Sequence, residues 1–172
     1  MRICVFAGCS IDGFIAHVDG SLDFLKPFES GDNGYFAFMD TIDTLVIGRE
    51  TYELVLTFPD WPYEGKRVVV LTHRPIQPRR GETTHSGTLK PLFDRLAAEG
   101  VKRVYLDGGQ AVRQGLDEDL VDELTISTVP RTLGAGRPLL GGAASLKAWK
   151  MVSSRTLGLG VLQSKWERER QL

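Results

Sequence analysis

The stretch TLVIGRETYE, residues 44–53, joins an apolar segment to a polar one at a single glycine. Residues 45–47 are a short apolar run of the kind found in buried strands, and Gly48 ends it. The residues from Arg49 onward have a helical pattern, which must end before Pro59 because proline cannot continue a helix. A buried strand that passes directly into a helix is the repeating unit of an α/β fold.

The same alternation of strands and helices continues through most of the chain. It predicts one domain, residues 1–172, with a mostly parallel sheet covered on both faces and antiparallel strands at its C-terminal end. Residues 10–31 form a long connection, which in a compact domain is usually functional or partly structured. The expected strands are 2–9, 44–47, 66–72, 103–109 with its terminal turn, 122–130 and two between 149 and 167, with a short strand as an alternative at 81–86; the expected helices are 32–41, 49–58, 89–100 and 111–116.

Composition and charge are those of an ordinary soluble protein. Of the 172 residues, 42% are hydrophobic and 25% are charged. The formal net charge of -1 provides no global field for nucleic acid or an anionic membrane, so we expect neither as a partner. No apolar run approaches the roughly 20 residues that span a bilayer. Residues 1–10 lack the long apolar core of a signal peptide, and we expect a cytoplasmic protein.

The cysteines and histidines show no pattern of a disulfide or a metal site. Cys4 and Cys9 would face opposite sides of the first strand, so we expect two buried thiols. His17, His73 and His85 are scattered and lack the spacing of metal ligands, so we expect no metal.

Gly48 and Arg49 are placed to receive an anion. A helix N-terminus offers free N–H groups and a partial positive charge, and a phosphate fits there. Glycine allows close approach to the backbone, arginine adds a planar charged fork, and Thr51 adds a hydroxyl. The alternative is a glycine turn followed by a solvated arginine.

Two further strand ends repeat this chemistry. Thr72, His73 and Arg74 follow a buried strand, and their hydroxyl, imidazole and guanidinium together suit a phosphate on a ribose. Gly108 and Gly109 precede a helix, and paired glycines permit backbone geometries barred to other residues. Each stretch alone is also compatible with a polar loop or a tight turn. Together the three strand ends predict a nucleotide-sized ligand at the carboxyl edge of the sheet, although neither the GxGxxG fingerprint nor a Walker motif occurs.

Asp32 is the candidate proton donor. On the expected helix it would share an apolar face with Tyr35 and Phe36, where partial desolvation would raise its pKa toward neutrality. The alternative is a helix N-cap, a position that aspartate favours. Residues 12–22 are the expected lid that excludes water from the site.

These motifs, in this order, resemble the dihydrofolate reductase superfamily, and within it the branch of small bacterial proteins related to the reductase domain of the riboflavin-pathway deaminase–reductase. The resemblance extends over most of the chain and implies a dihydrofolate-reductase-like three-layer sandwich. It is carried by SIDGFIA at 10–16, IGRETYE at 47–53, VVLTHRP at 69–75, LDGGQAV at 106–112 and VDELTISTVPRTLGAGRPLL at 121–140.

The resemblance implies an NADPH-dependent reductase. Arg49 and Arg74 would favour NADPH over NADH, and the two glycines of LDGGQAV would pack against the cofactor, often through a cis Gly–Gly peptide. The cofactor-binding residues that the resemblance implies are Ala7, Ile15, Ala16, Gly48, Arg49, Thr51, Leu71, Thr72, His73, Arg74, Asp107, Gly108, Gly109, Gln110 and Ala111.

The resemblance also implies a substrate side. Asp32 and Ser127 match an acid and the hydroxyl that often hydrogen-bonds it, and Tyr35 and Phe36 match substrate contacts. The implied substrate is a planar nitrogen heterocycle, either a pterin or an aminopyrimidine. The segment before Asp32 lacks the Pro-Trp of true folate reductases, which argues against dihydrofolate itself as the substrate.

Two alternative functions are compatible with the sequence, and we also expect a homodimer. One alternative is the reductase of the aminouracil ribosyl phosphate in riboflavin biosynthesis, for which Arg131 or Arg137 would hold the second phosphate. The lack of a deaminase domain argues against a full pathway enzyme. The other is a nucleotide-binding protein without catalysis. Members of this branch often pair through the antiparallel end of the sheet, so residues 157–162 are the expected contact of a homodimer.

Overall fold

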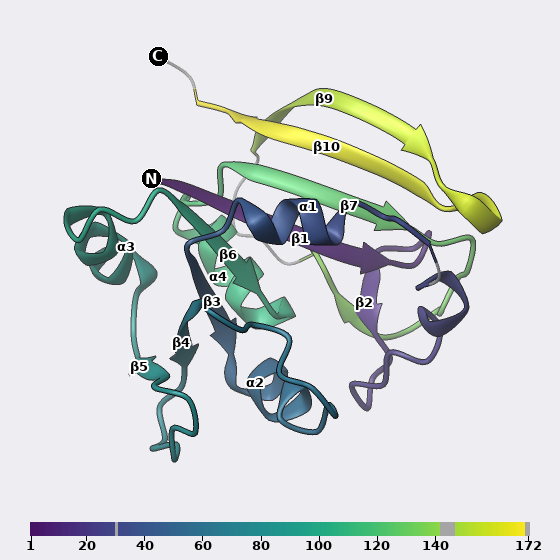
Figure 1. The fold of residues 1–172 in the computed structure, drawn as a ribbon. Coiled ribbons are helices and arrows are strands. Elements are labelled where there is room, and N and C mark those ends of the chain that lie inside the picture. Colours follow the sequence, from purple (N-terminus) through teal and green to yellow (C-terminus); the bar gives the residue numbers. More distant parts are fainter. Residues whose placement is uncertain (30, 142–146, 171–172) are drawn as a thin grey trace.

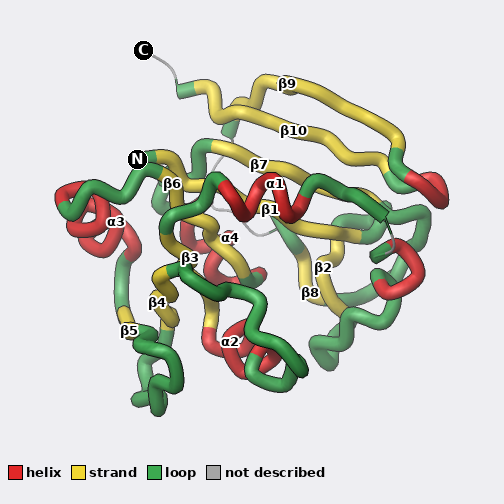
Figure 2. Tube along the Cα trace, in the orientation of Figure 1, coloured by secondary structure: helices red, strands yellow, loops and turns green. Residues whose placement is uncertain are grey.

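The strand and helix expected around residues 44–53 are present: β3 (Thr44–Gly48) passes directly into α2 (Arg49–Val55). The computed structural model, drawn in Figure 1 and Figure 2, describes residues 1–29, 31–141 and 147–170. The other strands are β1 (Arg2–Cys9), β2 (Phe14–Ala16), β4 (Arg67–Leu71), β5 (Thr83–His85), β6 (Arg103–Asp107), β7 (Glu123–Thr128), β8 (Arg137–Pro138), β9 (Ala148–Thr156) and β10 (Leu162–Glu169). The other helices are α1 (Tyr35–Asp40), α3 (Leu89–Ala98) and α4 (Gly109–Asp117), with two short 3-10 helices, η1 (Lys26–Phe28) and η2 (Gly158–Gly160).

Eight strands form one sheet in the order β5-β4-β3-β6-β1-β7-β10-β9. The pairs from β5 to β7 are parallel, whereas β10 runs antiparallel to both β7 and β9. β2 and β8 form a separate antiparallel pair. The predicted mostly parallel sheet with antiparallel C-terminal strands is confirmed.

Side chains of the central strands alternate between two hydrophobic clusters, one on each face of the sheet. In β3, Val46 belongs to one cluster, and Leu45 and Ile47 belong to the other, as the period of two in a strand requires. The apolar faces of α3 and α4 pack into the first cluster, and those of α1 and α2 pack into the second. Helices therefore cover both faces, which makes the three layers seen in Figure 1.

The glycine in the middle of α4 lets this helix approach the sheet closely. A Cβ atom at Gly115 would lie 2.5 Å from Cδ2 of Leu106 in β6 and 3.1 Å from Cγ2 of Val121. Glycine lowers the intrinsic stability of a helix, but a larger residue here would push α4 away from β6.

The register of the parallel strands brings three strand ends to one level. Gly48 lies opposite Leu71 of β4, and Ile47 lies opposite Asp107 of β6. Because parallel strands end at the same edge of a sheet, the turns that follow β3, β4 and β6 are neighbours.

The predicted boundaries hold for most elements, but three helices are shorter than expected; α3 ends at Ala98 rather than at residue 100. Helix α1 begins at Tyr35 rather than at residue 32, because the Asp32 carboxylate accepts the N–H of Gly34 at 2.8 Å and the Asn33 side chain accepts the N–H of Tyr35 at 3.0 Å. Such side-chain bonds to the local backbone compete with helix formation. Helix α2 ends at Val55. No helix among the described residues is long and apolar enough to cross a membrane.

Residues 157–162, the expected homodimer contact, comprise the connection between β9 and β10 and the first residue of β10. Leu159 and Leu162 are exposed in it, and Val161 is buried. Both cysteines are free and buried.

Candidate functional site

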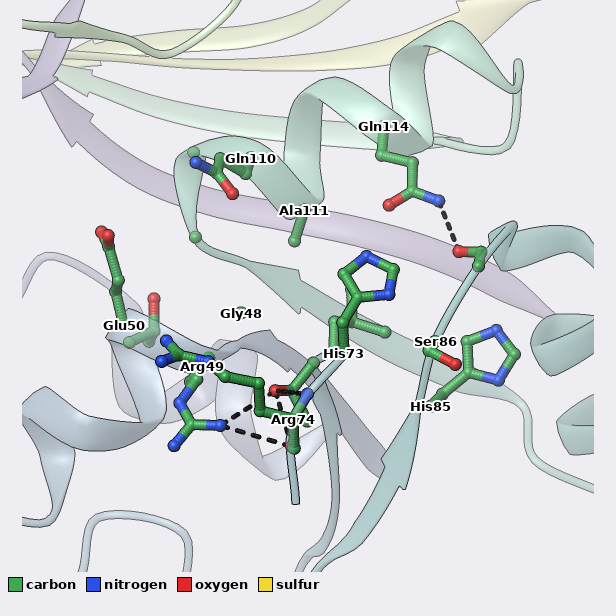
Figure 3. Close-up of a pocket in the computed structure, with 16 residues that line it drawn as sticks. Gly48, Arg49, Glu50, His73, Arg74, His85, Ser86, Gln110, Ala111 and Gln114 are labelled. Atoms are coloured by element: carbon green, nitrogen blue, oxygen red, sulfur yellow. Dashed lines mark hydrogen bonds between the residues drawn. The ribbon is translucent and has the colours of Figure 1, made fainter. Parts of the chain in front are cut away.

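A cavity of about 330 Å³ opens at the carboxyl ends of β3, β4 and β6, shown in close-up in Figure 3. All three predicted strand ends meet in it, and Figure 3 shows His73 and Arg74 on one side and the start of α4 on the other. The expected cofactor residues that line it are Gly48, Arg49, Thr51, Leu71, Thr72, His73, Arg74, Gly108, Gly109, Gln110 and Ala111. The structure therefore gathers these residues as the sequence predicted.

Gly48 leaves open space on the wall of this cavity. Its backbone is extended, with φ -66° and ψ 157°, a conformation that any residue adopts. A Cβ atom built on Gly48 would meet nothing within 4 Å. The protein itself therefore does not require glycine here, and the space that a side chain would fill belongs to the cavity.

Gly108 and Gly109 are required for a different reason: neighbouring residues lie too close to the backbone at these positions to leave room for a side chain. Gly108 has φ 100°, which disfavours any side chain, and a Cβ atom there would lie 2.9 Å from Oγ1 of Thr51 and 3.4 Å from the backbone N of Gly48. A Cβ atom on Gly109 would lie 2.9 Å from Cδ1 of Ile15. The two glycines let the turn into α4 pack against the turn into α2 and against β2.

Hydrogen bonds of the Arg49 guanidinium connect the end of β3 to the residues that follow β4. Its Nε donates to Oε1 of Glu53 at 2.7 Å, and its Nη1 donates to Oγ1 of Thr72 at 3.2 Å and to the carbonyls of Arg74 and Pro75 at 3.3 Å. Arg49 thus places a fixed positive charge beside the end of β4.

His73 and Arg74 are exposed at the mouth of the cavity. Within residues 1–29, 31–141 and 147–170, Arg74 forms no ion pair. Its guanidinium is therefore available to an anionic ligand.

Five lining residues were not expected: Glu50, His85, Ser86, Gly87 and Gln114. His85 is the last residue of β5, and Ser86 and Gly87 follow it, so they lie at the end of the short strand that was an alternative at 81–86. Gln114 lies one helical turn after Gln110 and donates to the carbonyl of Gly87 at 2.8 Å. Nothing in the sequence marks Glu50 as part of an anion site.

Ala7, Ile15 and Ala16 lie outside the walls of the cavity. Ala7 is half-buried in β1 opposite Ile126, Ile15 contacts the position of Gly109, and Ala16 is buried in β2. The described part of the chain contains no cis peptide bond, so the Gly108–Gly109 peptide is trans, unlike the cis peptide that the resemblance implied.

Asp107, an expected cofactor residue, does not line the cavity but is a partly buried acid directly before Gly108, which does. Its Oδ1 accepts the N–H of Gly108 at 2.8 Å. Burial raises the pKa of Asp107 to about 6, against the opposing effects of the Gly108 N–H and the Tyr105 side chain. A carboxyl group with such a pKa exchanges protons near neutrality.

Aromatic rings surround the α1 side of Asp107. Phe6 contacts Tyr35 and Phe38 with ring centroids 5.5 and 5.0 Å apart, and Tyr105 contacts Tyr35 and Phe38 at 6.5 and 5.1 Å. Burial, followed by the charge of Asp107, raises the pKa of Tyr35 to about 12, so Tyr35 stays neutral.

The structure corrects the expectation for Asp32. The residue precedes α1, is exposed, and accepts the Gly34 N–H, so it is neither desolvated nor the N-cap, which is Gly34. Phe36 is 80% exposed and forms no apolar face with it. The expected contact between Ser127 and Asp32 is replaced by another: Oγ of Ser127 accepts from Nε2 of Gln163 at 3.0 Å. The sequence shows the acid but not the turn that exposes it.

The arginines considered for a second phosphate are engaged elsewhere. Arg131 lies over the ring of Phe28, 5.6 Å from its centroid, and Arg137 pairs with Glu50 at the cavity wall. The expected lid, 12–22, is partly structured, because it contains β2.

A family model described as the RibD C-terminal domain matches residues 2–163. The chain belongs to the RibD C-terminal domain family. This membership confirms the resemblance to the dihydrofolate-reductase-like superfamily and supports an oxidoreductase of the riboflavin-pathway type.

Relatives and solved structures agree with this family. The uncharacterized protein YwjB of Bacillus subtilis (strain 168) is 34% identical over 164 residues, which cover 93% of this chain and 94% of YwjB. A Shewanella sp. PV-4 structure, provisionally named a riboflavin biosynthesis protein, is 35% identical with a TM-score of 0.90, covering 99% of this chain and 100% of that chain. The fold is shared with the Thermotoga maritima diaminohydroxyphosphoribosylaminopyrimidine deaminase/5-amino-6-(5-phosphoribosylamino)uracil reductase, at 14% identity and a TM-score of 0.72, over 97% of this chain and 56% of that chain.

Proposed function

We propose that this RibD C-terminal domain protein is an NADPH-dependent reductase of a planar nitrogen heterocycle. The observation that carries the proposal is the unfilled space at Gly48 beside Arg49 and Arg74, where three strand ends converge. No packing within the protein requires glycine at this position, whereas a phosphate close to the backbone does.

The residues of the cavity fit the parts of NADPH. The backbone at Gly48 offers room for a pyrophosphate, and Gly109, in the wall of the same cavity, begins α4, whose N-terminus has no side-chain cap. Thr72 and Arg74 fit a phosphate on the adenosine ribose, and guanidinium groups bind phosphates through paired hydrogen bonds. The extra phosphate distinguishes NADPH from NADH, so Arg74 is the residue proposed to select it.

When bound, the cofactor supplies the hydride, and this chain supplies placement and a proton. Asp107 meets the requirement that Asp32 was expected to meet, because it is partly buried, beside the cavity, and has a pKa of about 6. Tyr35 and the rings around it provide an apolar surface for a flat substrate on the same side. We therefore propose Asp107 as the group that holds the proton for the substrate nitrogen.

The aminouracil ribosyl phosphate of riboflavin biosynthesis is the second candidate substrate. Family membership and the name of the Shewanella protein favour it. The pairing of Arg137 with Glu50 and the position of Arg131 over Phe28 disfavour the phosphate site first expected for it.

A turnover assay tests the proposal. NADPH oxidation would be followed with dihydropterins and with aminouracils that carry or lack a ribosyl phosphate. Turnover of either class supports a reductase, and the preferred class decides between the candidates. NADPH binding without turnover of any of these compounds would instead support the non-catalytic alternative.

A further inference from the structure

A second cavity, of about 340 Å³, lies at the opposite end of α2 from the strand-end cavity. Helix α2 is labelled in Figure 1; its first residues line the strand-end cavity and its end lines this one. The volume is within the range of small-molecule sites, roughly 300–1,000 Å³. Its lining is Val55, Leu56, Phe58, Pro59, Trp61, Arg79 and Arg80, which are five apolar residues and two arginines with no carboxylate.

A buried carboxylate holds the two arginines in place. Oε2 of Glu82, a residue 5% exposed, accepts the backbone N–H groups of Arg79 and Arg80 at 2.8 and 2.9 Å. Burial alone would raise the pKa of Glu82, but these backbone donors keep it below its ordinary value, so the anchor stays charged. The backbone that presents both guanidinium groups is therefore fixed before any ligand arrives.

Few acidic side chains would compete with an anionic ligand for the two guanidinium groups. Arg80 lies over the Trp61 ring, 5.4 Å from its centroid, and its only ion pair in the described chain is with Glu64 at 3.8 Å. Glu64 is 86% exposed, and ion pairs at such positions contribute little free energy. Arg79 forms no ion pair with any residue that the structure describes. Asp60, between two lining residues in sequence, is the nearest acid along the chain.

Tyr52 of α2 supports the Glu82 carboxylate behind the cavity wall. Tyr52 lies one helical turn before Val55 and is 2% exposed. Burial, followed by the charge of Glu82, raises the pKa of Tyr52, so its hydroxyl stays protonated and helps to keep Glu82 charged. The anchor of Arg79 and Arg80 is therefore held from α2 as well.

We propose that this second cavity binds a small aromatic carboxylate, with its ring against Phe58 and Trp61 and its carboxylate between Arg79 and Arg80. An aromatic face beside two guanidinium groups complements such an anion in both shape and charge. The site is separate from the proposed cofactor site and does not depend on the reductase proposal.

The test uses 1-naphthoate as the probe and the full-length chain labelled with ¹⁵N. Binding is followed by amide chemical shifts, in the wild type and in the double variant Arg79→Gln/Arg80→Gln. Arg95→Gln is the matched control, because the side chains of Arg95 and Arg80 are equally exposed, at 52%. The neutral analogue 1-naphthamide tests the need for charge.

Saturable shifts confined to residues 55–61 and 79–82 are expected. Loss of one charge-assisted contact corresponds to about tenfold weaker binding or more, and we expect this in the double variant and for naphthamide, but not in Arg95→Gln. Asp60→Asn should leave the affinity unchanged or raise it. The proposal is overturned if millimolar naphthoate does not saturate, if the shifts map to the strand-end cavity, or if naphthamide or the double variant binds as well. None of these results bears on NADPH binding.

Discussion

The Asp107 carboxylate accepts the backbone N–H of Gly108 at 2.8 Å, and this bond connects the proposed proton-holding group directly to the floor of the cavity. Asp107 itself does not line the cavity: it directly precedes Gly108, which does, and its charge acts on Tyr35 and Tyr105 of the aromatic layer under α1. Its raised pKa results from that position, since β1, β6 and α1 together bury the carboxylate.

Replacement of Asp107 by Asn should remove the proton but keep the hydrogen bond from Gly108, because the amide oxygen can still accept it. We expect kcat/KM to fall by about 100-fold or more, as for loss of a general acid. The wild-type kcat/KM should decline as pH rises above about 6, where Asp107 loses its proton. Stopped-flow measurement across the pH range would show both effects.

Asp32→Asn is the matched control for that variant. Its side chain can still accept the Gly34 N–H, so the turn before α1 should persist, and we expect activity close to the wild type. Loss of activity in Asp32→Asn with full activity in Asp107→Asn would reverse the two assignments.

Asp107 should also make stability depend on pH. Its pKa is 3.8 when exposed and about 6 in the folded state, so the folded protein binds the proton more tightly. The contribution of this group to the free energy of unfolding is then full below pH 3.8 and is lost as pH rises through about 6. At neutral pH, Asp107→Asn should be more stable than the wild type, by about 3 kcal/mol, with a smaller difference near pH 4. Equal differences at both pH values, measured by urea unfolding, would contradict a raised pKa.

Arg74→Gln should weaken NADPH binding by about tenfold and leave NADH binding nearly unchanged. The reason is that Arg74 is exposed at the cavity mouth and forms no ion pair in the described chain, so only the extra phosphate loses a partner. Titration of both nucleotides gives the ratio. An equal loss of affinity for NADPH and NADH would show that Arg74 does not bind the extra phosphate.

Gly115→Ala should destabilise the fold by about 1–3 kcal/mol, because the added Cβ would lie 2.5 Å from Leu106. Gly48→Ala is a suitable comparison, since its φ is ordinary and its Cβ meets no neighbour. Urea unfolding should show a lower midpoint for the first variant and an unchanged or slightly higher one for the second. An unaltered midpoint for Gly115→Ala would mean that α4 has room to move.

Much of this architecture could be predicted because the central strands carry a strong local signal. In the strand expected at 66–72, residues 68–71 are an unbroken apolar run, which indicates burial on both faces. Each glycine or cation that follows a parallel strand lies at the carboxyl edge of the sheet. The rule depends only on strand direction, so it found most of the cavity lining without any knowledge of side-chain contacts.

The proton-holding group could not be predicted in this way. Asp32 has the expected spacing from Tyr35, but whether it joins the helix depends on a competition with local turns formed by Asp32 and Asn33. Asp107 looks like an ordinary turn residue in sequence. Its pKa depends on which rings cover it, and Phe6 and Tyr35 come from distant parts of the chain.

The most direct test of the central claim is the affinity for NADPH of the wild type and of Gly48→Val, measured by calorimetry alongside thermal unfolding. A Cβ atom at Gly48 meets no neighbour, so the variant should fold, with a loss of about 1 kcal/mol at most for a less favoured N-cap residue, while its side chain fills the volume proposed for a phosphate. The account predicts saturable NADPH binding by the wild type and a loss of at least about tenfold in the variant. No binding by the wild type, or equal binding by a folded Gly48→Val, would contradict it.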